Sequence, residues 1–225
     1  MGGKSSKPSA PAPPTRGPAG TPTRGRPATK AAGADRDRSR TPPRYKYLNT
    51  KPIFFPDPKL PCPNFLEGRG CHKRSCALAH EATGLVHLIR HFDSARKSLD
   101  VCVFVITCDA ISNAVIAAHK RGLRVRVITD DDQMETKGSD VVKMAAAGIP
   151  VRNDSNKAHM HHKFTIVDGK VLISGSFNYT RQAVLQNREN VTFHTDRPTL
   201  AAFCKEFDGL WKEFASNKVE GKASG

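Results

Sequence analysis

The sequence predicts an α/β fold in which helices flank a mixed β-sheet, and three observations lead to it. The chain has 225 residues, which is enough for one sizeable hydrophobic core with appendages. Between residues 84 and 152, apolar runs of strand length alternate with segments of helical periodicity. From residue 161 to residue 194, strand follows strand, with turn residues between them.

The first half of this region alternates helices and strands. The elements expected are a helix at 85–95, a strand at 99–107, a helix at 111–119, a strand at 125–128, a helix at 140–147 and a short strand at 149–152. The run 99–107 is apolar and rich in valine, which is typical of a strand buried on both faces. Gly122 and Gly148 follow two of the helices, in positions that favour helix ends.

The second half is richer in strands. The elements expected are strands at 161–167, 171–174 and 191–194, a loop at 181–190 and a closing amphipathic helix at 200–214. Asp168-Gly169 lies between the first two strands and is a typical hairpin turn. The resulting division of the chain is a tail at 1–46, a lead-in with a cysteine cluster at 47–83, the α/β domain at 84–216 and a frayed tail at 217–225.

The first 46 residues have a composition that does not favour a packed core. They hold 11 Lys and Arg against two acidic residues, a net charge of +9, and nine of the 16 prolines. We expect this segment to be disordered, because it cannot bury enough apolar surface to offset its ordering entropy. Its charge suits a polyanion such as nucleic acid or an anionic membrane, although a solubilising tail is an equal alternative.

The N-terminus and the hydropathy of the chain bear on membrane contact. Met1-Gly2-Gly3-Lys4-Ser5-Ser6 matches the pattern for myristoylation of Gly2, and basic residues that could supply a second attraction follow it. No run of about 20 apolar residues is present, so no transmembrane helix is expected. Any membrane contact is therefore expected to be peripheral or through the acyl chain.

Three of the six cysteines cluster with a histidine within 19 residues. The predicted metal ligands are Cys62, Cys71, Cys76 and His80, a donor set that suits a tetrahedral structural Zn²⁺. The segment from Cys62 to Cys71 resembles CCCH zinc fingers. The neighbouring Phe65, Arg69, Lys73 and Arg74 would allow RNA contact, and a purely structural zinc knot is the competing interpretation. The remaining cysteines lie in apolar segments, which favours a reducing compartment.

The segment from His161 to Asp168 and the following Gly175-Ser176-Phe177-Asn178 carry the predicted chemistry. Alternation along a strand sends His161 and Lys163 to one face, and a hairpin brings Ser176 and Asn178 beside them. A histidine nucleophile, a lysine charge and two hydrogen-bonding side chains suit attack on a phosphodiester. By contrast, His159 and His162 are interpreted as packing or surface residues, and the run Asp130 to Asp132 as a turn or helix cap.

The pattern His-x-Lys-x4-Asp followed by Gly-Ser-x-Asn resembles the signature of the phospholipase D superfamily, over residues 84 to 216. The resemblance implies a metal-independent phosphodiesterase with a phosphohistidine intermediate on His161. It also implies phosphate contacts from Lys163, Ser176 and Asn178, and an orienting carboxylate, for which Glu189 is the candidate. Asp168 is expected to brace the site from its turn.

The chain holds one copy of the motif, whereas superfamily members use two. The resemblance therefore implies a homodimer with one shared active site. A single motif preceded by a CCCH-like cluster is similar to the branch of this family that hydrolyses cardiolipin or cuts single-stranded RNA of the piRNA type. That branch acts on the cytosolic face of the mitochondrial outer membrane; a cytoplasmic protein is the second interpretation of the location.

The motif does not separate a lipid substrate from RNA, since both present the same phosphate. The cysteine cluster favours RNA slightly, and a myristoylated Gly2 would favour lipid. A different class of function remains as an alternative, namely a non-catalytic RNA-binding protein in which the His-x-Lys unit is a dimerisation scaffold.

Overall fold

The computed structural model describes residues 50–132, 139–155 and 157–221. The predictions for the tail at 1–46, for Gly2 and for residues 222–225 fall outside these ranges and stay predictions.

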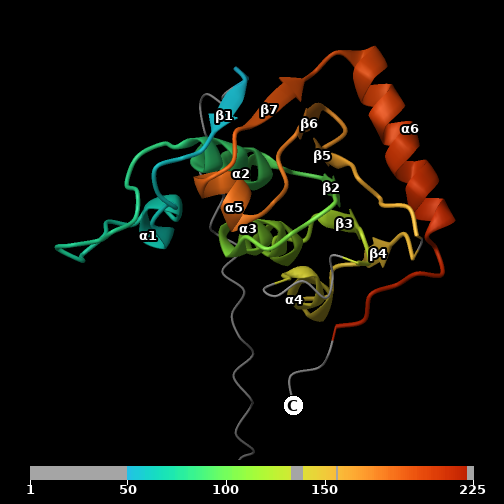
Figure 1. The fold of residues 1–225 in the computed structure, drawn as a ribbon, viewed down its shortest axis with the longest axis horizontal. Helices are drawn as coiled ribbons and strands as arrows, with labels where there is room; N and C mark the ends of the chain where they lie inside the picture. Colours follow the sequence, from blue (N-terminus) through green and yellow to red (C-terminus); the bar gives the residue numbers. More distant parts are fainter. Residues whose placement is uncertain (1–49, 133–138, 156, 222–225) are drawn as a thin grey trace, which may run out of the picture. The chain divides into compact units, whose positions relative to one another are not determined.

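Seven strands form one mixed sheet in the order β1-β7-β6-β5-β2-β3-β4 (Figure 1). The strands are β1 (Ile53–Phe55), β2 (Ser98–Val103), β3 (Arg124–Thr129), β4 (Val151–Asn153), β5 (Lys163–Val167), β6 (Val171–Gly175) and β7 (Glu189–His194). β2, β3 and β4 pair in parallel, whereas β1, β7, β6 and β5 pair antiparallel up to β2. The predicted α/β class with a mixed sheet is confirmed.

Helices cover both faces of this sheet. They are α1 (Pro63–Leu66), α2 (Gly84–Ser94), α3 (Asp109–Lys120), α4 (Val141–Ala146), α5 (Arg181–Leu185) and α6 (Arg197–Glu213). The parallel strands are joined through α3 and α4, as parallel pairing requires. Buried residues of α2, α3 and α4 belong to one apolar cluster, and those of α6 belong to a second cluster across the sheet.

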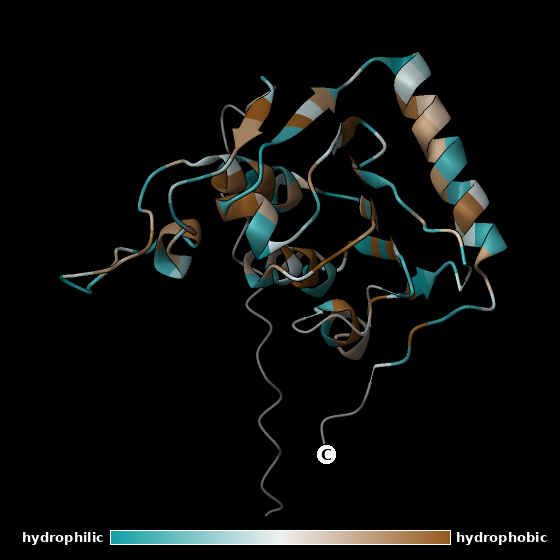
Figure 2. Cartoon of the chain, viewed as in Figure 1, coloured by the Kyte–Doolittle hydropathy of each residue, from teal (hydrophilic) through white to brown (hydrophobic). Residues whose placement is uncertain are grey.

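Alternation of side chains along a strand explains how β5 contributes residues to both apolar clusters. On β5, Phe164 and Ile166 pack in the cluster with α6, whereas Val167 belongs to the cluster with α2 and α3. All six residues of β2 are buried, as expected for a strand covered on both faces. Figure 2 shows hydrophobic and hydrophilic stretches along α6, which agrees with a helix that buries one side, including Phe207.

The structure departs from the sequence-based expectation at short elements. The sequence predicts a lead-in without a strand where the structure has β1, and a loop where the structure has α5. β1 lies among prolines and is a strand because it pairs with β7 at the edge of the sheet. α5 is one short helix that begins after Thr180, whose hydroxyl accepts a hydrogen bond from the Ala183 N–H. The strand expected from residue 161 begins at Lys163 instead.

The expected hairpin turn is present. Asp168 and Gly169 have φ values of +55° and +63°, the left-handed pair of a tight two-residue turn. No helix in the described ranges is both long enough and apolar enough to cross a bilayer.

The buried α2 face predicts a large stability difference between two phenylalanines. Phe92 is 0% exposed, whereas Phe54 on β1 is 73% exposed. We expect Phe92→Ala to lower the free energy of unfolding by about 3–5 kcal/mol and Phe54→Ala by less than about 0.5 kcal/mol. Urea denaturation followed by circular dichroism measures both, and similar losses for the two variants would contradict the packing described.

Candidate active site

β5 delivers the two central side chains of the candidate site. Lys163 is the first residue of β5 and pairs with Val103 of β2. Pairing of Phe164 with Ser174 fixes the register of β5 against β6. Continuing this register by one step places Lys163 opposite Gly175, so that the residues just after β6 lie beside the segment just before β5. The structure therefore brings Ser176 and Asn178 to the end of the sheet that carries His161, as the sequence predicted.

His161 and Lys163 gather around the ring of Phe104. The ring centroids of His161 and Phe104 are 4.6 Å apart, and the Lys163 Nζ lies 4.8 Å from the Phe104 centroid. The Lys163 Nζ also donates a 2.7 Å hydrogen bond to the His161 carbonyl oxygen. Phe104 thus contacts both groups. The sequence does not reveal this role, because its pattern predicts Phe104 only as part of an apolar strand.

The electrostatic setting favours a neutral His161. Desolvation lowers the pKa of His161, and the positive charge of Lys163 lowers it further. Desolvation also lowers the pKa of Lys163, against the opposing effect of the carboxylates of Glu189 and Asp130. A neutral imidazole keeps the lone pair that a nucleophile needs, so this arrangement suits attack on phosphorus.

Ser176 and Glu189 form one hydrogen-bonded unit. The Ser176 hydroxyl donates to the Glu189 carboxylate and accepts a 3.2 Å hydrogen bond from the Asn190 N–H. The Asn187 side-chain amide donates to Glu189 at 3.0 Å. The structure therefore places Glu189 against Ser176 and Asn187 and not in a hydrogen bond to His161; its role as the orienting carboxylate stays a prediction.

Close approach of two strands makes this unit possible. A Cβ on Gly175 would lie 2.0 Å from the Asn190 carbonyl oxygen, so only glycine fits there. The approach lets the Ser176 N–H donate to the Asn190 carbonyl at 3.2 Å. Glycine at this position of the Gly-Ser-x-Asn pattern thus sets where Ser176 meets β7.

Asn178 carries a polar atom with no partner. Its side-chain Oδ1 is buried and forms no hydrogen bond with any described residue. Its neighbours are both buried: Phe177 stacks on Phe55 with centroids 4.2 Å apart, and the Tyr179 hydroxyl lies 2.6 Å from the Thr165 hydroxyl. The Oδ1 atom is an acceptor and needs a donor, so the phosphate contact predicted for Asn178 would come from its side-chain NH₂ group.

Asp168 does not join this site. It lies at the opposite end of β5 from Lys163, about 17 Å along the strand. Its carboxylate accepts hydrogen bonds from the N–H groups of Arg96, Lys97 and Ser98 at 2.7 to 3.0 Å. Asp168 therefore ties the hairpin to the beginning of β2, and any influence on His161 passes through the position of β5.

The predicted metal ligands come together apart from this site. One donor atom from each of Cys62, Cys71, Cys76 and His80 lies within 4.8 Å of the others. The Cys62 N–H donates to the Ala79 carbonyl at 2.9 Å, which closes the loop between them. A hydrogen bond from the Phe65 N–H is the largest of the effects that lower the pKa of Cys62 to about 7. Three thiols and an imidazole at this spacing fit a tetrahedral zinc ion.

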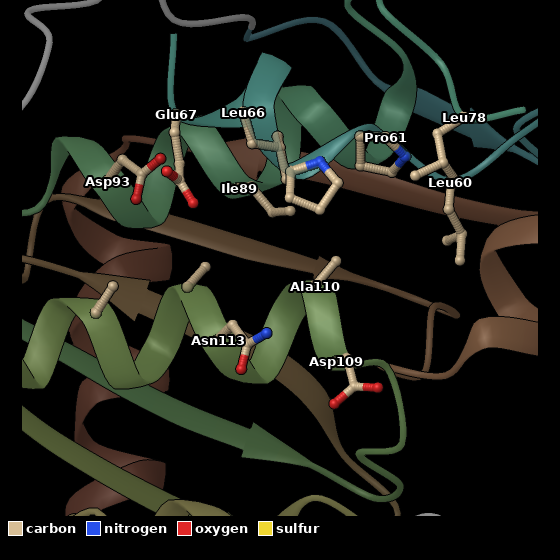
Figure 3. Close-up of a pocket in the computed structure, with 13 residues that line it drawn as sticks. Leu60, Pro61, Leu66, Glu67, Leu78, Ile89, Asp93, Asp109, Ala110 and Asn113 are labelled. Carbon is tan, nitrogen blue, oxygen red and sulfur yellow. The ribbon is translucent and has the colours of Figure 1, made fainter. Parts of the chain in front are cut away.

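A cavity of about 370 Å³ lies between this cysteine segment and the α2–α3 layer. Figure 3 shows Leu60, Pro61 and Leu66 above Ala110 and Asn113 of α3. None of the predicted phosphate-facing residues lines it. Its lining is mostly apolar, so we assign it to the junction between the cysteine segment and the helices, not to the catalytic site.

Comparisons with known proteins agree with the geometry of the site. A family model described as "Cardiolipin synthase, PLD-like domain" matches residues 88–211. A protein of Chlamydomonas reinhardtii named mitochondrial cardiolipin hydrolase is 50% identical over 72% of this chain and 73% of its own length. The mouse protein of that name is 42% identical, over 74% of this chain and 77% of its own length.

The chain belongs to the mitochondrial cardiolipin hydrolase family. It is a phospholipase D-type hydrolase. Among solved structures, the phospholipase D family member Nuc of Salmonella typhimurium aligns with a TM-score of 0.58 at 29% identity, over 62% of this chain and 92% of Nuc. NucT of Helicobacter pylori, with a TM-score of 0.50 at 22% identity over 59% of this chain and 87% of NucT, shares the fold. Membership of this family agrees with the predicted superfamily.

The surroundings of His161 predict the direction in which its pKa departs from the ordinary value. Because desolvation and Lys163 both lower the pKa of His161, we expect its imidazole to titrate below the ordinary value of 6.5 and to be mostly neutral at that pH. Nuclear magnetic resonance of the histidine side chains measures this, with the His161 signal identified by its loss in His161→Gln. Removing the lysine charge in Lys163→Met should raise the midpoint, and a midpoint at or above 6.5 in the wild type would contradict this description.

Proposed function

We propose that this family member hydrolyses cardiolipin by a metal-independent mechanism in which His161 forms a phosphohistidine intermediate. The observation that carries the proposal is the gathering of His161, Lys163, Ser176 and Asn178 at one end of β5 and β6, with His161 in a setting that keeps it neutral. The names of the relatives supply the lipid substrate.

The proposed reaction has two steps. A ring nitrogen of His161 attacks phosphorus, a nitrogen–phosphorus bond forms, and the bond from phosphorus to the leaving oxygen breaks with a proton delivered to that oxygen. Water then attacks phosphorus and releases phosphatidic acid and free His161. The Lys163 ammonium and a hydrogen bond from the Asn178 side-chain amide stabilise the negative charge on the non-bridging oxygens in both steps. The Ser176 hydroxyl would join them after turning away from Glu189, to which it donates in this structure.

The leaving oxygen needs a proton from an acid. Superfamily members take it from the histidine of a second motif, and this chain has one motif. We place His161 of the partner subunit in this role, in a two-fold homodimer with one shared cleft. One imidazole attacks while the other, protonated, gives up its proton, and the roles reverse for water. Two Lys163 side chains would then border the cleft, which suits an anionic substrate.

For the cysteine segment we propose a structural zinc ion held by Cys62, Cys71, Cys76 and His80. The ion would fix a short segment that contains only the four-residue helix α1 and two isolated bridge residues, Pro61 and Ala79. It takes no part in the chemistry at His161.

A second candidate activity, cleavage of single-stranded RNA, is favoured by the exposed basic residues of the same segment. Arg69, Lys73 and Arg74 are exposed, and Phe65, which lines one pocket together with Arg69, is half-buried. Basic side chains next to an aromatic ring are the usual means of holding a single strand. A non-catalytic RNA-binding protein would use the same surface but would not need His161.

We further propose peripheral attachment to the cytosolic face of the mitochondrial outer membrane. The names of the relatives support the mitochondrial location, and the membrane face is the expectation from the family resemblance. Myristoylation of Gly2 together with the basic tail would supply the anchor. If Gly2→Ala left the membrane-bound fraction of the protein unchanged, this anchor would be excluded.

The proposed chemistry predicts a sharp contrast between adjacent histidines. We expect His161→Gln to lower the rate of cardiolipin hydrolysis at least about a thousandfold. His162→Gln, which removes contacts with Glu206 and with the Phe164 ring, should lower it less than about threefold. EDTA should not abolish the reaction while the zinc ion is retained.

The assay uses zinc-loaded protein with cardiolipin vesicles and, in parallel, end-labelled single-stranded RNA. Cleavage of RNA without hydrolysis of cardiolipin would show that the substrate is nucleic acid. Equal rates for the two histidine variants would contradict a reaction at His161.

The proposed zinc site predicts a metal content. We expect one zinc ion per chain by mass spectrometry of the metal, lost in Cys76→Ser and retained in Cys204→Ser, because Cys204 lies on α6 outside the cluster. The Cys76→Ser protein should also unfold at a lower temperature. A zinc content that is the same in both variants would overturn the assignment.

A further inference from the structure

A second group of metal-ligating side chains lies beside the catalytic segment. The carboxylates of Asp130 and Asp132 and the imidazole of His159 each offer an atom within 4.8 Å of the others. The His159 Nδ1 lies 3.1 Å from the Asp130 Oδ2 and 3.9 Å from the Asp132 Oδ2. Ligands of one divalent ion, each about 2.0–2.2 Å from it, lie roughly 3–4.4 Å apart, so these separations suit coordination.

Asp130 supplies the independent sign that a ligand belongs there. It stands at the end of β3 and is 0% exposed, and its Oδ1 has no hydrogen-bond partner among the described residues. A buried carboxylate that is incompletely paired is costly, and an ion is one of the few explanations for it. Within the described ranges its one salt-bridge partner is His159, which is 49% exposed.

The hydrogen bonds of the neighbouring carboxylates show which acidic residues hold the loop and which are available to a ligand. Both carboxylate oxygens of Asp154 are occupied, by the N–H groups of Asp131 and Met160 at 3.1 and 2.7 Å. The Asp131 carboxylate accepts the N–H of Asp132 at 3.0 Å. These two therefore hold the loop in shape, whereas the exposed Asp132 carboxylate and His159 are free to turn toward an ion.

We propose that Asp130, Asp132 and His159 form a binding site for a divalent cation, separate from the cysteine cluster and from the reacting groups. Two carboxylates and one imidazole suit Mn²⁺ or Co²⁺ better than Ca²⁺. His159 is exposed and packs against Phe104, as the sequence analysis expects, and the proposal adds a ligand role for it and for Asp130 and Asp132.

The site has a direct route of influence on catalysis. The rings of His159 and His161 both contact Phe104, at centroid distances of 5.4 and 4.6 Å. A cation held by His159 thus adds positive charge on the side of the nucleophile. It would attract an anionic phosphodiester toward the catalytic segment without itself touching the reacting atoms. This consequence rests on the proposed function, whereas the binding of the ion does not.

The test is binding of Mn²⁺ to zinc-loaded, full-length protein without substrate, measured by the electron paramagnetic resonance signal of free Mn²⁺. Zinc stays in the thiolate cluster, which Mn²⁺ does not favour. We expect one Mn²⁺ per chain, and at least about tenfold weaker binding in Asp132→Asn and in His159→Gln. Both positions are exposed, so neither substitution threatens the fold.

Asp131→Asn distinguishes this site from its neighbour, because Asp131 belongs with Asp130 and Asp154 to a second group whose carboxylates lie within 4.8 Å of one another. We expect its affinity to stay within about twofold of the wild type. Absence of binding at millimolar Mn²⁺, or equal affinity in all three variants, would overturn the site.

Discussion

The antiparallel pairing of β5 with β6 is the constraint on which the candidate site depends. The register that joins Phe164 to Ser174 decides which residues extend past the end of the sheet. A slip by one residue would turn Lys163 to the opposite face and bury it against α6. Two separate features secure the register: the left-handed Asp168-Gly169 turn, and the three backbone hydrogen bonds that Asp168 accepts at the start of β2. The acidic residue of the motif thus acts at a distance from the phosphate-facing groups.

The same end of the sheet gathers charges of both signs within a small space. Lys163 lowers the pKa of His161, while the carboxylates of Asp130 and Glu189 favour the charged form of Lys163. A neutral nucleophile beside a cation that stays protonated is the combination that attack on a phosphodiester anion requires. Phe104 provides the apolar surface that keeps these groups together, and His159 extends the arrangement toward Asp130.

Periodicity and turn chemistry were sufficient to predict the α/β class, the long helices and the central strands. They failed where tertiary contacts decide. β1 has three residues and owes its strand conformation to β7, and α5 is too short for a periodic signal. For the site, the motif and the family resemblance singled out His161, Lys163, Ser176 and Asn178, and their phosphate contacts stay predictions. The contacts of Glu189 with Ser176 and Asn187, the support from Phe104 and the burial of Asp130 depend on neighbours distant in sequence, which no local pattern encodes.

The most direct test of the account is to trap the covalent intermediate. The enzyme is mixed with cardiolipin for a few milliseconds, quenched in alkali, digested and analysed by mass spectrometry for a modified histidine. The account predicts a phosphoramidate adduct on His161, at about one adduct for every two chains because one imidazole of each pair must act as the acid. An adduct on another residue, or turnover without any adduct, would contradict the assignment of His161 as the nucleophile.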